Sequence, residues 1–193
     1  MAALKILVIP GSLRTGSFNA RLAAVAAKEL ALLDVNVTLI SLADYPLPIY
    51  DGDLEAKSGV PANAFSLKRM IGAHHGVFII TPEYNASVPP LLKNAIDWVT
   101  RARDRNETFG QVFCDRVFAI GAASEEKFGG LRALMALRQI LALGCGATVI
   151  PKQMALSFAD QAFDEMDRLK DPTDAEMLRG TLRQLIDVAQ QMM

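Results

Sequence analysis

Short apolar runs alternate with longer amphipathic segments along most of the chain. The runs are rich in β-branched residues and are bounded by Gly, Pro or polar residues, which is typical of buried strands. Five such strands are predicted, at residues 4–9, 35–40, 76–81, 116–122 and 147–150. Apolar residues at helical spacing predict helices at residues 21–33, 62–72, 91–103, 131–143 and 178–189.

Local signals support several of these boundaries. Pro89 and Pro90 suit a helix start, because the first helical turn has N–H groups without intrahelical acceptors. Gly144 is expected to end the helix before it. The segment from Asp44 to Gly52 contains two prolines and three acidic or glycine turn residues, so a loop is expected there, with Asp44, Asp51 and Asp53 in solvent. No structure is assigned to residues 151–172.

Strands that alternate with helices predict an α/β fold with a parallel sheet covered by helices on both faces. We expect a flavodoxin-like, doubly wound, five-stranded sheet in the order 2-1-3-4-5. No repeat or linker divides the chain, so residues 1–193 are interpreted as one domain. This order places a ligand crevice at the carboxyl ends of the first and third strands.

Composition excludes several classes of protein. Of the 193 residues, 51% are hydrophobic and 21% are charged, and the formal net charge is −1. No global positive field is therefore available to attract nucleic acid or an acidic membrane. No run approaches the ~20 apolar residues of a membrane span, and the amino-terminal run is too short for a signal peptide. We expect a cytoplasmic protein that has no nucleic-acid or membrane partner.

The cysteines and histidines do not have the spacing of a metal site. Cys114 and Cys145 belong to no zinc, haem or CxxC pattern, so we expect two small buried hydrophobic residues and no disulfide framework. His74 and His75 have no further ligands at suitable spacing and are interpreted as a pair at a helix end. The sequence therefore predicts no metal.

The loop after the first predicted strand reads GSLRTGSFN at residues 11–19. It is rich in hydroxyls and glycine, and it lies where a strand leads into a helix, whose N-terminus attracts anions. Ser12, Ser17 and Asn19 are candidate donors to a phosphate, and Arg14 adds charge. The loop lacks the P-loop and dinucleotide motifs, and it has no cysteine nucleophile. An ordinary capped turn, with Ser17 or Asn19 as N-cap, is the alternative.

The loop after the third strand reads TPEYNASVP at residues 81–89. Its prolines and Tyr84 offer rigid apolar surface for a flat heteroaromatic ring. Asn85 and the loop backbone offer hydrogen-bond partners for the edge of that ring. A turn stiffened by proline is the simpler alternative for this loop alone. The two loops at adjacent strand ends together favour a ligand with an anionic tail and a flat ring.

GSLRTGSFN followed by TPEYNASVPPLLKNAIDW resembles the NAD(P)H-dependent FMN reductases, a family that includes bacterial quinone, chromate and azo reductases. The similarity covers roughly residues 4–150. It implies that the FMN phosphate and ribityl chain are surrounded by Ser12, Arg14, Ser17, Phe18 and Asn19. It also implies that the isoalloxazine is bordered by Pro82, Glu83, Tyr84 and Asn85, with Ser124 near the ring. Gly129 and Gly130 match a glycine pair that opens the following helix.

The chain departs from the family at three places. Ala86 replaces an aromatic residue of some relatives, and Pro90-Leu91 stands where some have Gly-Gly. Glu125-Glu126-Lys127 is more charged than the small apolar turn that is usual after Ser124. The resemblance implies that aromatic side chains near the ring help to form the substrate pocket and subunit contacts. These changes therefore affect which oxidant is used and how subunits assemble.

The resemblance implies an oxidoreductase that passes electrons from NADPH or NADH through bound FMN to small oxidants such as quinones, azo compounds, chromate or free flavin. Such a mechanism needs no catalytic acid–base residue. A flavodoxin-type electron carrier is the alternative, although carriers that dock by electrostatics tend to be strongly acidic. A regulatory receiver module of the same fold would need acidic residues at the ends of the first and third strands, where this chain has Gly11-Ser12 and Pro82-Glu83. The family also implies a homodimer or homotetramer, with Trp98 and the helices at 91–103 and 131–143 as candidate contacts.

Overall fold

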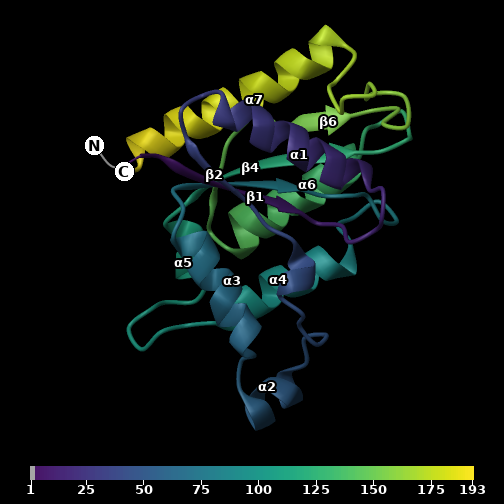
Figure 1. Cartoon of the computed structure of the whole chain (residues 1–193). Helices are drawn as coiled ribbons and strands as arrows, with labels where there is room; N and C mark the ends of the chain where they lie inside the picture. Colours follow the sequence, from purple (N-terminus) through teal and green to yellow (C-terminus); the bar gives the residue numbers. More distant parts are fainter. Residues whose placement is uncertain (1–2) are drawn as a thin grey trace.

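The computed structural model describes residues 3–193 and is built around one parallel sheet (Figure 1). Its strands are β1 (Lys5–Pro10), β2 (Asn36–Leu39), β3 (Gly76–Ile80), β4 (Val117–Ala123) and β5 (Thr148–Val149). They follow the order β2-β1-β3-β4-β5, which confirms the predicted flavodoxin-like topology. Every predicted strand boundary lies within one residue of the observed one, and the topology is unchanged.

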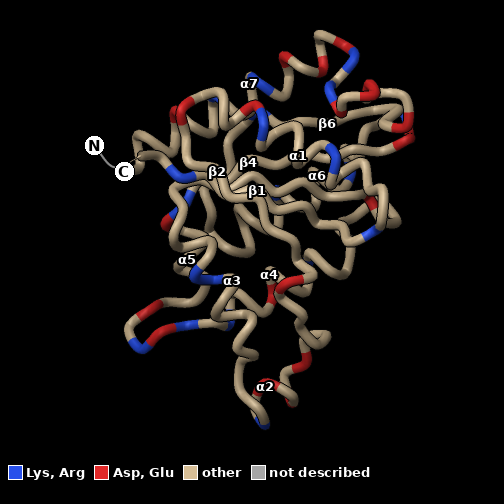
Figure 2. The backbone as a smooth tube through the Cα atoms, in the orientation of Figure 1, with Lys and Arg blue, Asp and Glu red and all other residues tan. Residues whose placement is uncertain are grey.

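Two helical layers cover the two faces of the sheet (Figure 1). Alternate residues of β1 point to opposite faces, so Ile6 and Val8 pack in one core and Leu7 and Ile9 in the other. The first core is closed by α1 (Phe18–Ala31) and α7 (Pro172–Gln191). The second is closed by α3 (Ala62–Gly72), α4 (Pro90–Arg101), α5 (Gln111–Cys114) and α6 (Leu131–Gln139). Charged residues of both signs lie around this apolar centre (Figure 2).

Several predicted helices differ from the observed ones at their ends, and the last of them, α7, begins at Pro172 rather than at residue 178. The first begins at Phe18 rather than residue 21, because the Ser17 hydroxyl caps it by accepting from the N–H of Ala20 (3.4 Å). The helix predicted at 131–143 ends its α-helical part at Gln139. Residues Ile140–Gly144 then form a π-helical turn, so Gly144 lies inside a helical segment rather than after it.

The expected loop after β2 was wrong in part, because it contains a 3₁₀ turn (Leu42–Asp44) and helix α2 (Gly52–Ser58). Asp51 is exposed, as expected, and its carboxylate accepts from the N–H groups of Asp53 and Leu54 at the start of α2. Glu55 of α2 pairs with Arg101 of α4 (2.9 Å), and this contact lowers the pKa of the Glu55 carboxyl. The segment therefore packs on α4 through a charged contact.

Residues 151–172, to which no structure was assigned, contain a sixth strand, β6 (Met154–Leu156). This strand pairs in parallel with the carboxyl-terminal half of β4, beyond the point where β5 stops. Met154 and Leu156 are fully buried, and Phe163 bridges back to Leu169. β6 thus extends the sheet beside the end of β4.

The cysteine and histidine predictions had mixed outcomes. Cys145 is buried, and burial raises the pKa of its thiol to about 11. Cys114 is exposed rather than buried, and its thiol donates to the Cys145 carbonyl oxygen (3.3 Å). His74 follows α3 and is buried between the Met70 carbonyl (2.7 Å) and the Thr38 hydroxyl (2.8 Å), and this burial lowers its pKa. Among residues 3–193, no helix is long and apolar enough to cross a membrane.

Candidate functional site

A cleft of about 200 Å³ lies where β1, β3 and β4 end. These three strands are neighbours in the sheet, so their carboxyl-terminal loops meet at one edge. Every predicted site residue except Asn85 lines this cleft, and the lining also includes three residues that were not predicted. The lining residues are Ser12, Arg14, Ser17, Phe18, Asn19, Pro82, Glu83, Tyr84, Ala123, Ser124, Glu125 and Glu126.

Backbone hydrogen bonds hold the loop after β1 in place at both of its ends. The Gly11 N–H donates to the carbonyl of Ile80 in β3 (2.7 Å), and the Ser17 N–H donates to the Arg14 carbonyl (3.1 Å). The Ser12 hydroxyl oxygen accepts from the Arg14 N–H (3.3 Å), which leaves the hydroxyl proton available. The loop is therefore a fixed turn that leads directly into α1.

Several donors of this loop have no acceptor in the described part of the chain. The backbone N–H groups of Thr15, Gly16, Phe18 and Asn19 make no hydrogen bond within residues 3–193. The Arg14 guanidinium is exposed, pairs with none of the carboxylates described, and lies 5.7 Å from the centre of the Phe18 ring. Unpaired amides at a helix N-terminus, together with a free guanidinium, suit a phosphate dianion.

Asn19 has a different arrangement from the one predicted. Its side-chain amide donates to the Ala123 carbonyl and accepts from the Ala123 N–H, both at 2.9 Å. Asn19 is 4% exposed. Its two hydrogen bonds to the Ala123 backbone join α1 to the end of β4, and they resemble the backbone pairing between neighbouring strands. Its oxygen and one amide proton are therefore already engaged, and only the second amide proton could be donated to a phosphate, as the sequence predicts for Asn19. Ser17, and not Asn19, is the N-cap.

The loop after β3 forms a tight turn. Tyr84 and Ser87 exchange two backbone hydrogen bonds (2.9 and 3.0 Å), and Asn85 and Ala86 between them have φ of +49° and +64°. Asn tolerates this left-handed region, whereas Ala is strained there. Asn85 is thus a turn residue, and its side chain does not line the cleft. Tyr84 is half exposed and offers an aromatic surface beside Pro82.

Glu83 has a role that sequence reasoning missed. α6 begins after Gly130, which has no side chain to cap it. The Glu83 carboxylate instead accepts from the N–H groups of Arg132 (3.1 Å) and Ala133 (3.2 Å) and pairs with the Arg132 guanidinium. A helix that opens with two glycines and no Ser, Thr, Asp or Asn is the signal that could have indicated a cap from elsewhere.

The turn after β4 completes the cleft. The Ser124 hydroxyl accepts from the Glu126 N–H (3.2 Å), and its backbone N–H donates to Leu156 of β6 (3.0 Å). Gly130 has φ of +81°, and a Cβ there would lie 2.6 Å from the Cβ of Ala122. Only glycine fits this point, where α6 starts against β4. The predicted glycine pair does open the helix.

The family model for NADPH-dependent FMN reductases matches residues 4–161. The chain belongs to the NADPH-dependent FMN reductase family. As a member of it, the protein is an oxidoreductase with FMN as cofactor and NAD(P)H as electron donor. The resemblance inferred from the two loop motifs is confirmed.

Individual members of the family and their structures agree with this assignment. A quinone reductase of Escherichia coli K12 is 42% identical over 139 residues, which is 72% of this chain and 69% of the relative. An NAD(P)H-dependent FMN reductase of Pseudomonas aeruginosa is 34% identical over 183 residues, 94% of this chain and 93% of the relative. The flavoenzyme NAD(P)H:acceptor oxidoreductase FerB of Paracoccus denitrificans superposes with a TM-score of 0.78 at 28% identity, with 98% of each chain covered.

Proposed function

We propose that the cleft at the ends of β1, β3 and β4 is the FMN site. The observation that carries this proposal is the set of unpaired donors in the loop after β1. The four free N–H groups and the Arg14 guanidinium favour an anion at this end of the cleft. The Ser12 hydroxyl can add a further hydrogen bond to the phosphate.

The rest of the cleft suits the flat ring. Pro82 and Tyr84 supply apolar surface on a turn that its own hydrogen bonds hold rigid. Ser124 keeps its hydroxyl proton free, because its oxygen accepts from Glu126. Asn85 lies on the turn beside Tyr84, and its role is proposed to be shaping this turn. We expect these loops to orient the ring and to leave one face open to substrates.

Bound FMN would supply the two-electron chemistry that links NAD(P)H to an oxidant. The residues of this chain would bind and orient the cofactor, and no proton transfer by a side chain is required. Small quinones are the acceptors we favour. The E. coli relative is a quinone reductase, and a 2-hydroxy-1,4-benzoquinone reductase of Burkholderia is 43% identical over 99 residues. Azo compounds, chromate and free flavin are further candidate acceptors.

The experiment that tests this proposal uses the purified protein alone. We expect a yellow protein whose visible absorption bleaches on anaerobic addition of NADPH or NADH and returns when a quinone is added. Electron transfer to a quinone without any protein partner separates the enzyme from a flavodoxin-type carrier. A protein that binds FMN but is neither bleached by a nicotinamide nucleotide nor reoxidised by a quinone would contradict the proposal.

We also propose a homodimer or homotetramer. The exposed residues Leu131 and Met135 lie one turn apart on α6, with the exposed Phe128 just before the helix, and this apolar surface suits a subunit contact. Trp98, expected from sequence to take part, is fully buried and donates its indole N–H to the Pro48 carbonyl (2.7 Å). Light scattering should give a multiple of the 20.9 kDa chain mass, and a monomer would contradict assembly.

The compartment is a further proposal. Both cysteines are free thiols, and one is exposed, which suits a reducing compartment such as the cytoplasm. Fractionation of cells that make the protein should recover it in the cytoplasmic fraction. Recovery from another fraction would contradict this inference.

A further inference from the structure

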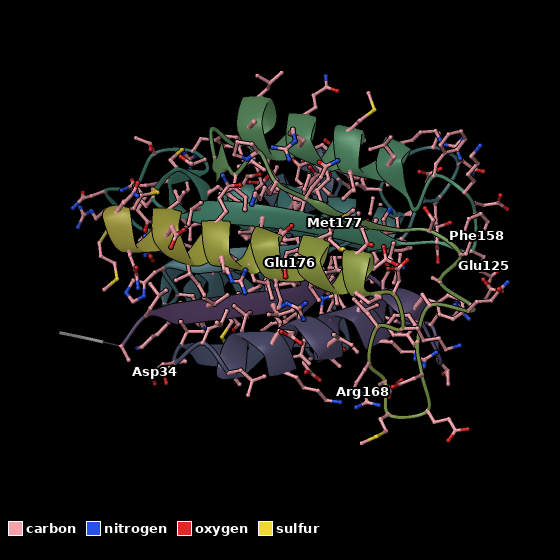
Figure 3. All side chains as sticks on the ribbon, turned by 90° about the horizontal axis from the view of Figure 1, so that it is seen from above. Asp34, Glu125, Phe158, Arg168, Glu176 and Met177 are labelled. Atoms are coloured by element: carbon pink, nitrogen blue, oxygen red, sulfur yellow. The ribbon has the colours of Figure 1, made fainter. Side chains whose placement is uncertain are left out.

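Two carboxylates stand in the wall of the cleft without cationic partners. Glu125 and Glu126 belong to the turn between β4 and α6, and both side chains are exposed and line the cleft. Neither forms an ion pair with any Lys or Arg of residues 3–193. Figure 3 places Glu125 at the edge of the molecule that lies opposite Asp34.

The other charged residues of the cleft are accounted for. Glu83 is compensated by Arg132, which lies against its carboxylate. Arg14 is the one cationic residue among those that line the cleft, and the proposed function assigns it to the FMN phosphate. The carboxylates of Glu125 and Glu126 are therefore the acidic side chains of the cleft that no described cation pairs with.

The turn that carries these carboxylates is held by backbone contacts. The Ser124 N–H donates to Leu156, and the Ala159 N–H donates to the Ser124 carbonyl, both at 3.0 Å. The Gly129 N–H donates to the Glu126 carbonyl (3.1 Å), and the Ser157 hydroxyl donates to the Lys127 carbonyl (2.7 Å). These bonds fix the backbone next to β6, so the two carboxylates stay at the cleft although their side chains are solvated. Lys127, in the same turn, does not line the cleft.

We propose that Glu125 and Glu126 are specificity-determining residues that select electron acceptors by charge, so that uncharged quinones are reduced in preference to anionic oxidants. This inference rests on the proposed function of the cleft. A like charge at about 5–10 Å in water disfavours an approaching anion by roughly two- to fourfold for each carboxylate. Dissolved salt screens the effect, because the Debye length is only about 3 Å at 1 M ionic strength.

The test compares two acceptors that share the naphthoquinone ring and differ by one anionic sulfonate group, 1,4-naphthoquinone and 1,4-naphthoquinone-2-sulfonate, on holoprotein. The variant is the isosteric double substitution Glu125→Gln/Glu126→Gln. The matched control is Asp34→Asn/Asp187→Asn, which removes two exposed carboxylates that no described residue pairs with and that lie outside the cleft. The ratio of kcat/KM for the two acceptors cancels effects on the nicotinamide donor. The dissociation constants of both quinones from oxidised holoprotein, followed by flavin absorbance, give a readout without turnover.

We expect the cleft variant to raise the sulfonate-to-naphthoquinone ratio of kcat/KM by about 4–15-fold at low salt, as two such charges imply. Sulfonate binding should tighten by a similar factor, naphthoquinone binding should stay unchanged, and the difference should fade in high salt. The control should keep the wild-type ratio. An unchanged ratio in the cleft variant, or an equal rise in the control, would overturn the proposal. Loss of FMN from the wild-type protein on dialysis would instead contradict the proposed function, so the two failures are distinguishable.

Discussion

The loops after β1 and β3 lie side by side at the same edge of the sheet, but they differ in whether their polar groups have hydrogen-bond partners within the protein. The loop after β1 leaves several backbone N–H groups, among them those of Thr15, Gly16, Phe18 and Asn19, and the Arg14 guanidinium without partners in residues 3–193. In the loop after β3, Tyr84 and Ser87 hydrogen-bond to each other. The Glu83 carboxylate of the same loop accepts hydrogen bonds from the first turn of α6.

This difference shows how one cleft can suit both ends of FMN. Free donors have high affinity for a phosphate, because it satisfies hydrogen bonds that the protein leaves open. A loop whose hydrogen bonds are already made is rigid and offers a shaped, largely apolar surface to a ring. The first loop is therefore expected to govern affinity for the cofactor, and the second to govern local stability.

The largest expected effect is on the loop with free donors. Arg14→Ala removes the one unpaired cation of the cleft, so FMN affinity should fall by about 1–3 kcal/mol, or roughly 5–150-fold. The free energy of unfolding of the apoprotein should hardly change, because Arg14 is exposed and forms no ion pair within residues 3–193. Fluorescence titration of apoprotein with FMN measures the first effect, and urea unfolding the second. Equal FMN affinity in the variant and the wild type would remove Arg14 from the site.

Glu83→Ala should show the opposite pattern for the loop after β3. The substitution removes two hydrogen bonds to the N-terminus of α6, so the free energy of unfolding should fall by about 1–2 kcal/mol. Arg132→Ala is the matched control, because it removes the ion pair but keeps the N-cap, and it should cost less than about 1 kcal/mol. Urea unfolding of both apoproteins measures the two losses in the free energy of unfolding. A larger loss in the control would mean that the ion pair, and not the cap, stabilises this contact.

The smallest effect concerns strain in the Tyr84–Ser87 turn. Ala86 has φ of +64°, where glycine is not strained, so Ala86→Gly should stabilise the protein by about 0.5–1 kcal/mol. Ala24→Gly, inside α1, is the control and should destabilise by about 1 kcal/mol. The midpoint temperature of thermal unfolding should rise for Ala86→Gly and fall for Ala24→Gly. A destabilised Ala86→Gly protein would contradict the strain assigned to this turn.

The sequence predicted those parts of the molecule that depend on local pattern. The unbroken apolar run at residues 6–9 indicates a strand buried on both faces, and the two loop motifs indicate where the cleft lies. β6 was missed because three residues become a strand only by pairing with β4, which lies more than thirty positions earlier. α2 had a local signal that was passed over, since Asp51 precedes a short run suited to a capped helix.

The site was predicted less completely than the fold for the same reason. The bonds between Asn19 and Ala123 join positions 104 residues apart, and Glu83 reaches α6 across about 50. Neither partner can be read from neighbouring residues. Motifs therefore indicated which residues gather at the cleft, whereas the structure was needed to show which of their polar groups are already engaged.

The central claim is that the loop after β1 binds the phosphate of FMN. It is tested most directly by measuring the affinities of apoprotein for FMN and for riboflavin, which lacks the phosphate, in the wild type and in Arg14→Ala. We expect the wild type to bind FMN far more tightly than riboflavin, and the substitution to weaken FMN alone, so that the gap narrows. Equal affinity of the wild type for the two flavins, or a gap that Arg14→Ala leaves unchanged, would contradict the account.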